Sequence, residues 1–456
     1  MSEKWIDLGP ESNLVTPADV VTAVDATSSD AQVPSAKCLN TMAGDIEEAL
    51  RIVRSGRVGG WIYGYVIDES DSNPATRVSY IEDNADFDPL YMDFTNDALV
   101  WGSWKDFVEE YFKPAMLKSD GTIDYYLNPY DLTKKADGVT ASDVANTSYD
   151  GNAMLIVKPI FYNIGRVSPT QIRVRFSNVK QGDDWFNWTH LKSDGTYADF
   201  CGWPLFEGGV HSSKLRSLSG LTPNANDNGF SLAVQYSHAT ANGSNWHLTT
   251  FADEMLIRML VPLLLRSTNS EACIGRSSQS TPTTGAFNAK GYFYGSDSAS
   301  PSTPGNKFLC MENFWADKWR RCIGAANIGA QLYVKLTPST ADGTSAQAFA
   351  TSSSNSDYSG YFHFPYALSS CSGVNCTRVS ANPFMATIPT YAAGSSFDTH
   401  YCDYVWWTRD ASVNGVCFGG GGSNNNGAGG AFAIGGNLSV NSAFDFYNAS
   451  LSYHFY

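Results

Sequence analysis

The glycine-rich C-terminal stretch, from Gly415 onward, constrains the fold more than any other part of the chain. Half of the residues from Gly419 to Gly436 are glycine, a composition typical of flexible linkers. After it, apolar and polar residues alternate from Ala449 to Phe455, and this period of two predicts a half-buried strand. A ribbon that runs into a closing strand displays Asn, Ser and aromatic side chains, which are typical of adaptable binding surfaces. The alternative is a glycine-rich turn region followed by an ordinary edge strand.

Composition and charge limit the class of protein. A chain of 456 residues predicts two or three domains. Only 16% of its residues are charged, while Gly and aromatic residues are abundant, which favours an all-β or α+β fold. The net charge of −15 argues against a nucleic-acid partner, because phosphate binding requires a basic surface. The N-terminus has no apolar signal segment, and the longest apolar run, 259–265, is too short for membrane insertion.

The residues that carry catalytic or metal chemistry are scattered. Nine cysteines occur without a CxxC pair, and we expect mostly reduced, buried thiols rather than a Cys371–Cys376 disulfide. The seven histidines lack metal-ligand spacing. P-loop, HExxH, GxSxG and EF-hand patterns are absent from the sequence. We therefore expect no metal and no cofactor.

The N-terminal segment predicts a short anchor followed by a helical stalk. Residues 1–16 are polar and are interpreted as a short anchor or docking peptide. In 17–56, apolar residues recur at three- and four-residue spacing, at Leu39, Met42, Ile46, Ala49 and Val53. This a/d seam predicts a short coiled-coil helix. The alternative is an amphipathic helix packed on its own domain.

The body of the chain predicts an α+β fold. Residues 57–150 are interpreted as a β-rich connecting region, with a strand at 61–67 and a short helix at 104–112. In 151–456, strands are expected at 153–162, 171–176, 330–336 and 403–407. One strong helix begins at Thr250, with Asp253 at the capping-box position, and Pro262 is expected to kink or shorten it.

The C-terminal motifs resemble those of a known family. Gly420-Gly421, a polar run, Gly430-Ala431-Phe432 and the segment 449–453, ASLSY, resemble the variable region of diversity-generating retroelement target proteins, such as the phage major tropism determinants. Residues 25–41 are similar to segments near the ends of phage fibres. The segment 312–315, ENFW, is similar to a signature of formylglycine-generating-enzyme-like domains, in which Trp315 and Trp319 belong to the core.

This resemblance implies a fold, a location and a function. It implies a C-type-lectin-like domain over 151–456, with a variable region at about 404–456. It also implies a virion protein that attaches a bacteriophage to a host-surface protein or glycan, as a homotrimer. The alternative is a structural or capsid-decoration fibre without a diversified ligand.

The resemblance also implies which residues contact the ligand. The mutable, ligand-binding positions would be Gly422, Asn424, Asn425, Ala433, Gly435, Asn437, Leu438, Ser442, Phe444 and Phe446. Phe444 and Phe446 are expected to point the same way on a strand and to anchor the ligand. Tyr404 and Trp407 would line the rim. Gly430, Ala431, Phe432, Leu451 and Tyr453 are expected to be buried scaffold.

Two activities found in similar folds are not expected. The EPN, QPD and WND motifs with which C-type lectins hold calcium are absent from this sequence. Formylglycine-generating enzymes use a cysteine pair, and only Cys417 lies in the corresponding region. We therefore expect a binding protein rather than an enzyme.

Overall fold

The computed structural model describes residues 58–223, 230–276, 283–297, 305–315, 318–329, 331–338, 340–345, 347–365, 368–419, 429–444 and 446–456. The predicted anchor at 1–16 and the predicted stalk at 17–56 lie outside these ranges, as do Gly422, Asn424 and Asn425. The chain divides into two compact units, Met1–Trp61 with Val179–Asp183, and Ile62–Asn178 with Asp184–Tyr456. In the described part of the first unit, the Gln181 side chain accepts from the Val58 amide at 2.8 Å and donates to the Gly59 carbonyl at 2.6 Å.

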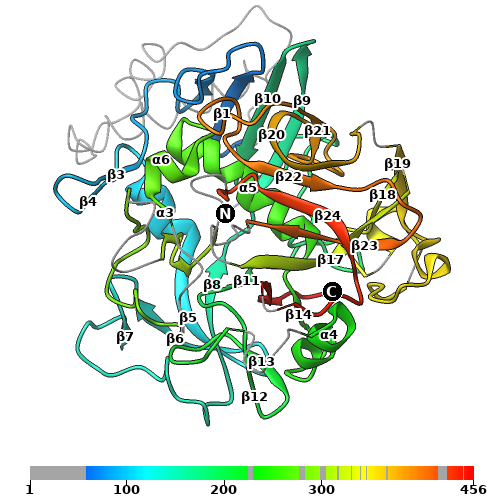
Figure 1. Ribbon diagram of the computed structural model, residues 1–456. Coiled ribbons are helices and arrows are strands. Elements are labelled where there is room, and N and C mark those ends of the chain that lie inside the picture. The colour runs from blue at the N-terminus through cyan, green and yellow to red at the C-terminus, as the bar shows by residue number, and fades with distance from the viewer. Residues whose placement is uncertain are drawn as a thin grey trace, which may run out of the picture. The chain divides into compact units, whose positions relative to one another are not determined.

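The second unit is built mainly from β-strands, part of which form a curled, half-barrel sheet (Figure 1). Strands take up 37% and helices 12%, so the expected β-rich body is confirmed, with few helices. The described helices are α3 Lys105–Tyr111, α4 Leu232–Thr240, α5 Phe251–Leu265 and α6 Ser270–Ile274, with 3₁₀ turns η1 Thr340–Asp342 and η2 Asn355–Tyr358. Among the described residues, none of these helices has the length and apolar character needed to cross a membrane.

The largest described sheet runs in the order β19-β18-β17-β23-β24-β22-β20-β21, with β25 added on β17. Its strands are β17 Trp319–Ile328, β18 Gln331–Val334, β19 Phe362–Pro365, β20 Cys371–Val379, β21 Pro389–Ala392, β22 Tyr404–Trp407, β23 Val413–Phe418, β24 Ile434–Ser439 and β25 Tyr447–Ala449. The expected strands at 330–336 and near 403–407 are confirmed as β18 and β22.

A second sheet runs in the order β14-β26-β11-β8-β5-β6-β7. Its strands are β5 Phe112–Lys118, β6 Ile123–Asn128, β7 Asp131–Lys135, β8 Gly151–Val157, β11 Cys201–Pro204, β14 Trp246–Leu248 and β26 Leu451–Tyr453. Because β5 pairs with β8 over its whole length, strands from the expected connecting region and from the expected domain beyond residue 150 share this sheet.

Smaller sheets complete the unit. One has the order β2-β1-β10-β9, and three are two-stranded. Their strands are β1 Ile62–Asp68, β2 Val78–Glu82, β9 Phe161–Ser168, β10 Gln171–Ser177, the pair β3 Tyr91–Asp93 and β4 Ala98–Val100, the pair β12 Gly209–His211 and β13 Lys214–Arg216, and the pair β15 Lys307–Phe308 and β16 Met311–Glu312. The strands expected near 61–67 and 171–176 are confirmed.

The C-terminal strand is internal to its sheet. β26 pairs with β14 on one side and with β11 on the other, so the alternative of an edge strand is wrong. Leu451 and Tyr453 are buried, as expected of scaffold residues. A closing strand in this position ties the last residues of the chain to segments about 200 residues earlier.

Helix α5 is the central helix of the unit, and every one of its residues is buried. Its N-terminus carries the predicted capping box: Thr250 Oγ1 accepts from the Asp253 amide at 3.1 Å, and Asp253 Oδ2 accepts from the Thr250 amide at 2.9 Å. Pro262 lies inside the helix, which continues to Leu265. The helix ends at its C-cap, Arg266, which has the left-handed conformation. The expected shortening at Pro262 is therefore wrong.

Candidate functional site

One face of the sheet formed by β22, β24, β23 and β17 packs against α5, which lies behind these strands in Figure 1. Arg320 on β17 forms a two-point ion pair with Glu254 of α5, at 2.9 and 3.1 Å. Arg258 of α5 lies over the Phe418 ring, 4.6 Å from its centroid. Since neighbouring strand residues point to opposite faces, Trp319 and Cys417, next to Arg320 and Phe418, lie on the face away from α5.

On that opposite face, two tryptophan rings meet above small residues. Trp406 pairs with Gly435, and Gly435 pairs with Cys417. The indoles of Trp406 on β22 and Trp319 on β17 reach across these two strands, with their centroids 5.4 Å apart in an edge-to-face contact. A methyl group at Gly435 would lie 2.8 Å from Cys417 Sγ and 3.7 Å from Trp319. The contact between the two indoles therefore requires small side chains beneath them, at Gly435 and Cys417, which we call the floor of this face.

The row of rings continues at both ends. Tyr404 lies 4.7 Å from Trp406, centroid to centroid, and Phe397 lies 3.8 Å from Tyr404. At the other end, the Trp319 amide donates to the Phe446 carbonyl at 2.9 Å. Phe446 stacks on Phe444 with a centroid distance of 4.9 Å and an interplanar angle of 11°. These half-buried or exposed rings, Trp319, Tyr404, Trp406, Phe444 and Phe446, form what we call the aromatic surface.

Arg321 supports the second end of the aromatic surface from below. Its guanidinium lies 3.9 Å from the centroid of the Tyr447 ring, which in turn contacts Phe446. It also donates to the carbonyls of Ser442 and Phe230. Because these contacts hold the turn at 442–447 on β17, Phe444 and Phe446 sit on a fixed backbone rather than on a free loop.

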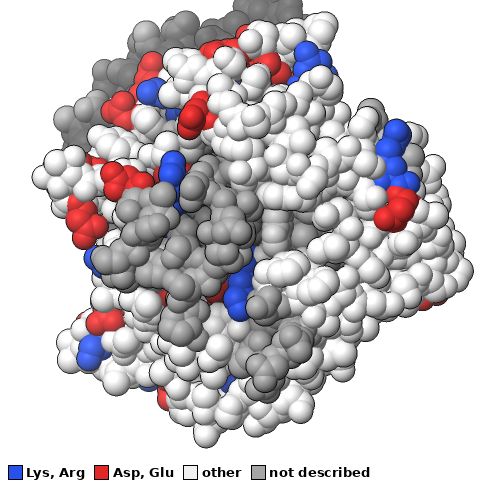
Figure 2. All heavy atoms as spheres, viewed as in Figure 1, with Lys and Arg blue, Asp and Glu red and all other residues white. Residues whose placement is uncertain are grey.

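The surface above these strands carries few charges. In Figure 2, which shows this side of the unit, the area over β22, β24 and β23 is almost entirely free of Lys, Arg, Asp and Glu and is hollowed near its middle. Phe444 is 43% exposed. An uncharged, concave area with exposed aromatic rings is typical of recognition surfaces rather than of the general protein surface.

The expected ligand-contacting residues fall into four groups. Those that are at least partly accessible are Tyr404, Asn437, Leu438, Ser442, Phe444 and Phe446. Ala433 and Trp407 lie in the core, at 0% and 2% exposure, so the structure removes them from the candidate surface. Gly435 is buried and belongs to its floor. Gly422, Asn424 and Asn425 lie outside the described residues.

The packing of β22 against β24 explains why Trp407 is buried. The Trp407 ring fills the space beside Gly436, where a methyl group would lie only 2.4 Å from it. Alternation along β22 thus sends Trp407 to the α5 side and leaves Tyr404 and Trp406 on the open side. Residues 442–444 and 446, which precede β25, do not belong to a strand. The two Phe rings do lie together, as expected, but because they stack and not because of strand alternation.

Sequence reasoning missed Trp406 and Trp319 as surface residues. Trp319 was expected in the core, yet it is only half-buried, whereas Trp315 is fully buried and donates to the Gly275 carbonyl at 2.9 Å. The signal for Trp406 was present, because period-two alternation in a strand that begins at Tyr404 puts residues 404 and 406 on one face. The expected scaffold residues Gly430, Ala431 and Phe432 are buried, and Asp403 accepts from the amides of Gly430 and Phe432.

Cys417, the cysteine of the C-terminal region, lies in an environment that does not favour reactivity. All eight described cysteines are free, in agreement with the expected reduced thiols. Cys417 is 3% exposed, and burial raises the pKa of its thiol to about 12. Because the thiolate is the reactive species, this environment disfavours oxidation or nucleophilic attack at Cys417.

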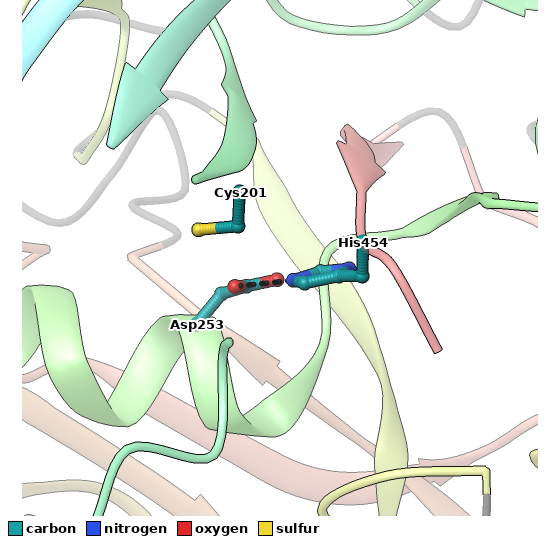
Figure 3. A group of neighbouring side chains, drawn as sticks. All are labelled: Cys201, Asp253 and His454. Carbon is teal, nitrogen blue, oxygen red and sulfur yellow. Dashed lines mark hydrogen bonds and ion pairs between the residues drawn. The ribbon is translucent and has the colours of Figure 1, made fainter. Parts of the chain in front are cut away.

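One buried group, Cys201, Asp253 and His454, has residue types that can hold a metal (Figure 3). The Asp253 oxygens are already occupied, since Oδ1 accepts from His454 Nε2 and Trp203 Nε1, both at 2.9 Å, and Oδ2 accepts from Ser452 and Thr250. Burial raises the pKa of the Cys201 thiol well above its usual range. A metal requires deprotonated, available ligands, so the group fits a hydrogen-bonded core network better than a metal centre.

Comparisons with known proteins add no further constraint. Neither a scan against protein-family models nor a search of curated proteins returned a match for this chain.

Proposed function

We propose that this chain is a receptor-binding protein of a bacteriophage virion, and that the aromatic surface binds a protein or glycan on the host cell. In this proposal the β-rich unit is a C-type-lectin-like domain whose variable positions lie in 404–456. A homotrimeric stalk at 17–56 displays three copies, and residues 1–16 attach them to the virion. Three weak sites on one particle reach high avidity without new contacts.

One observation carries the proposal: Phe444 is 43% exposed while stacked on Phe446, beside two further half-buried indoles. Exposing large rings in water is unfavourable, and a partner that covers them gains about 25 cal/mol for each Å² of apolar surface buried. Aromatic residues of this kind dominate the energetics of protein interfaces. The polar Asn437 and Ser442 nearby supply hydrogen bonds that adapt to different ligands.

The proposal assigns no catalytic role to the chain. Cys417, which the formylglycine-generating enzymes would suggest as a redox residue, lies under Gly435 with its thiol protonated. Replacing Cys417 by Ser is therefore expected to leave cell binding intact, apart from effects on stability.

The test is binding of the labelled full-length chain to intact cells from a panel of bacterial strains. On a strain that gives saturable binding, Phe444→Ala with Phe446→Ala, and Trp406→Ala alone, should each weaken the apparent affinity at least about tenfold, as expected for interface anchors. Tyr91→Ala, which removes a ring that is 44% exposed on the β3–β4 hairpin, is the matched control and should bind normally. Folded variants that bind as tightly as the wild type would refute the assignment.

A genomic observation separates this function from that of a purely structural fibre. A diversified binder requires a near-copy of the last hundred or so bases of the gene, with mismatches confined to adenines, beside a reverse transcriptase gene. If such a copy is found, variation should concentrate at Asn437, Leu438, Ser442, Phe444 and Phe446. Its absence, together with no cell binding, would favour the structural role.

A further inference from the structure

A second concave site shares no residue with the aromatic surface. It is a groove of about 870 Å³ between the β9–β10 turn, the residue after β1, and strands β20 and β21. Its volume lies in the range of small-molecule sites, about 300–1,000 Å³. The residues that matter for its chemistry are Glu69, Arg166, Arg378, Tyr391 and His400.

Glu69 and Arg166 form a fixed ion pair in the wall of the groove. The Glu69 side chain is fully buried, with Oε2 at 2.8 Å from Arg166 Nη2 and Oε1 accepting from the Val379 amide at 2.9 Å. Arg166 also donates to the carbonyls of Val379 and Pro169, each at 3.2 Å. It keeps 36% of its side chain exposed. The guanidinium is thus held in one orientation and still reaches solvent.

Arg378 and Tyr391 stand opposite each other on β20 and β21. They are cross-strand partners, and directly opposed residues share one face of a sheet. Tyr391 is 57% exposed, the most exposed aromatic ring among the described residues. Arg378 is exposed too, and forms no ion pair with any residue that the structure describes. An unpaired cation and an open ring therefore lie side by side.

The charges that line the groove leave one positive charge in excess. Arg166 is matched by Glu69, whereas Arg378 has no carboxylate opposite it. Burial lowers the pKa of His400, with the nearby Arg77 acting in the same direction, so its imidazole is neutral at pH 7. In a chain with a net charge of −15, an uncompensated guanidinium in a concave site favours an anionic ligand.

The side chains that line the groove indicate which other groups the anionic ligand carries. Thr377 and Thr390 also line the groove. The Thr377 hydroxyl already donates to the Tyr391 carbonyl at 3.2 Å, whereas a threonine hydroxyl such as that of Thr390 can both donate and accept. An open tyrosine ring packs against a flat C–H face, and a guanidinium forms two parallel hydrogen bonds with a carboxylate. We propose that this groove binds a carboxylate-bearing saccharide, with the carboxylate on Arg378 and a sugar face against Tyr391. This site is independent of the aromatic surface.

The test uses the full-length chain and a trisaccharide of galacturonic acid, with its methyl ester as the neutral match. Binding is measured by isothermal titration, or by ligand-observed NMR if it is weak. We expect the acid to bind and the ester to bind at least about tenfold more weakly. Arg378→Gln should weaken binding of the acid by a similar factor, and Tyr391→Ala by several-fold. Arg378→Lys should bind the acid more tightly than Arg378→Gln but less tightly than the wild type, because lysine keeps the charge but cannot form two parallel hydrogen bonds with a carboxylate.

Three controls make the outcome decisive. Lys113→Gln removes an exposed charge on β5 and should bind normally, as should Phe444→Ala. Equal binding of acid and ester, or unchanged binding by Arg378→Gln, would overturn the proposal. Inorganic phosphate that binds when the trisaccharide does not would also overturn it, since the groove would then be a simple anion site.

Discussion

Individual small residues determine where the aromatic rings of the sheet lie. Gly435 and Cys417 leave room on one face for Trp406 and Trp319 to meet, and Gly436 leaves room on the other for Trp407. A larger side chain at any of these positions would overlap with the rings and displace them from the sheet. The exposure of the aromatic surface is thus a consequence of glycines that themselves contact no ligand.

Replacing Gly436 by Ala tests this dependence. The added methyl group would lie 2.4 Å from the buried Trp407 ring, and overpacking of this kind costs about 1–3 kcal/mol. We expect urea denaturation to show a loss of that size in the free energy of unfolding. Gly165→Ala is the matched control, because a methyl group there meets nothing within 4 Å. A Gly436→Ala protein as stable as the wild type would contradict the packing.

His190 gives a prediction about acid stability. Burial lowers its pKa from 6.5 to about 4, and its Nε2 lies 2.9 Å from the Val157 carbonyl. Between pH 6.5 and pH 4 His190 is protonated in the unfolded chain but remains neutral in the folded chain. The free energy of unfolding therefore decreases as the pH falls through this range. His190→Gln removes the effect. The stability of the wild type relative to this variant should fall by up to about 1.4 kcal/mol per pH unit from pH 6.5 to 4. A constant difference would show that His190 is not buried as described.

The sequence identified some site residues but not the reason for their positions. Phe444 and Phe446 were found from the family motif, and they do lie together. Trp406 was missed because Trp407 was expected beside Tyr404, although alternation along the strand puts Tyr404 and Trp406 on one face. Which of the two faces is buried follows from the register with the neighbouring strand. The register depends on Gly435 and Gly436 in β24, a contact between segments that no local pattern reveals.

At the scale of elements, helix α5 and the C-terminal strand stabilise each other. Asp253 in the first turn of α5 accepts from Thr250 in its own capping box, from Ser452 on β26, and from His454 just after it. Trp203 on β11 donates to the same carboxylate. One side chain therefore joins the helix to two strands that lie far apart in sequence, and the closing strand depends on its charge.

Replacing Asp253 by Asn should destabilise the protein by about 1–3 kcal/mol, because an amide cannot accept from all the buried donors that the carboxylate satisfies and leaves one of them without a partner. Burial alone would raise the pKa of Asp253, but His454 and the Thr250 hydrogen bonds outweigh it and lower the pKa below 3.8. The contribution is therefore complete above pH 3.8 and is lost as pH falls through the lower, folded pKa. Asp106→Asn, in the exposed first turn of α3, is the control and should cost less than about 1 kcal/mol.

Unfolding measured at pH 7 and at pH 3 checks both statements. The wild type and Asp253→Asn should differ strongly at pH 7, and the difference should shrink at the lower pH. An equal difference at both pH values would mean that the carboxylate charge does not contribute to the stability of the fold.

The sequence predicted the elements better than their assembly. The capping box at Thr250 and the strands β1, β10, β18 and β22 follow from local patterns. The insertion of β26 between β14 and β11 does not, because pairing between residues about 200 positions apart has no local signature. For the same reason, the sharing of one sheet by β5 and β8 was not foreseen.

At the scale of the whole molecule, the account requires several copies of the aromatic surface on one particle. In the proposed homotrimer the predicted a/d seam at 39–53 would join the three copies, and polar residues in such a seam disrupt coiled coils. We expect sedimentation of the full chain at three times its 49.6 kDa mass. Leu39→Asp with Ile46→Asp should reduce it to a monomer with an unchanged near-UV spectrum. A wild-type monomer would contradict the predicted stalk.

The central claim is that the side chains of the aromatic surface change without unfolding the protein and thereby change what it binds. The most direct measurement is a substitution scan of Asn437, Leu438, Ser442, Phe444 and Phe446 in the full chain, sorted separately for protease resistance and for cell binding. Most substitutions should preserve protease resistance while abolishing or redirecting binding, whereas substitutions at Ala433 and Trp407 should abolish both. Substitutions at the five surface positions that unfold the protein, or that leave binding unaltered, would contradict the account.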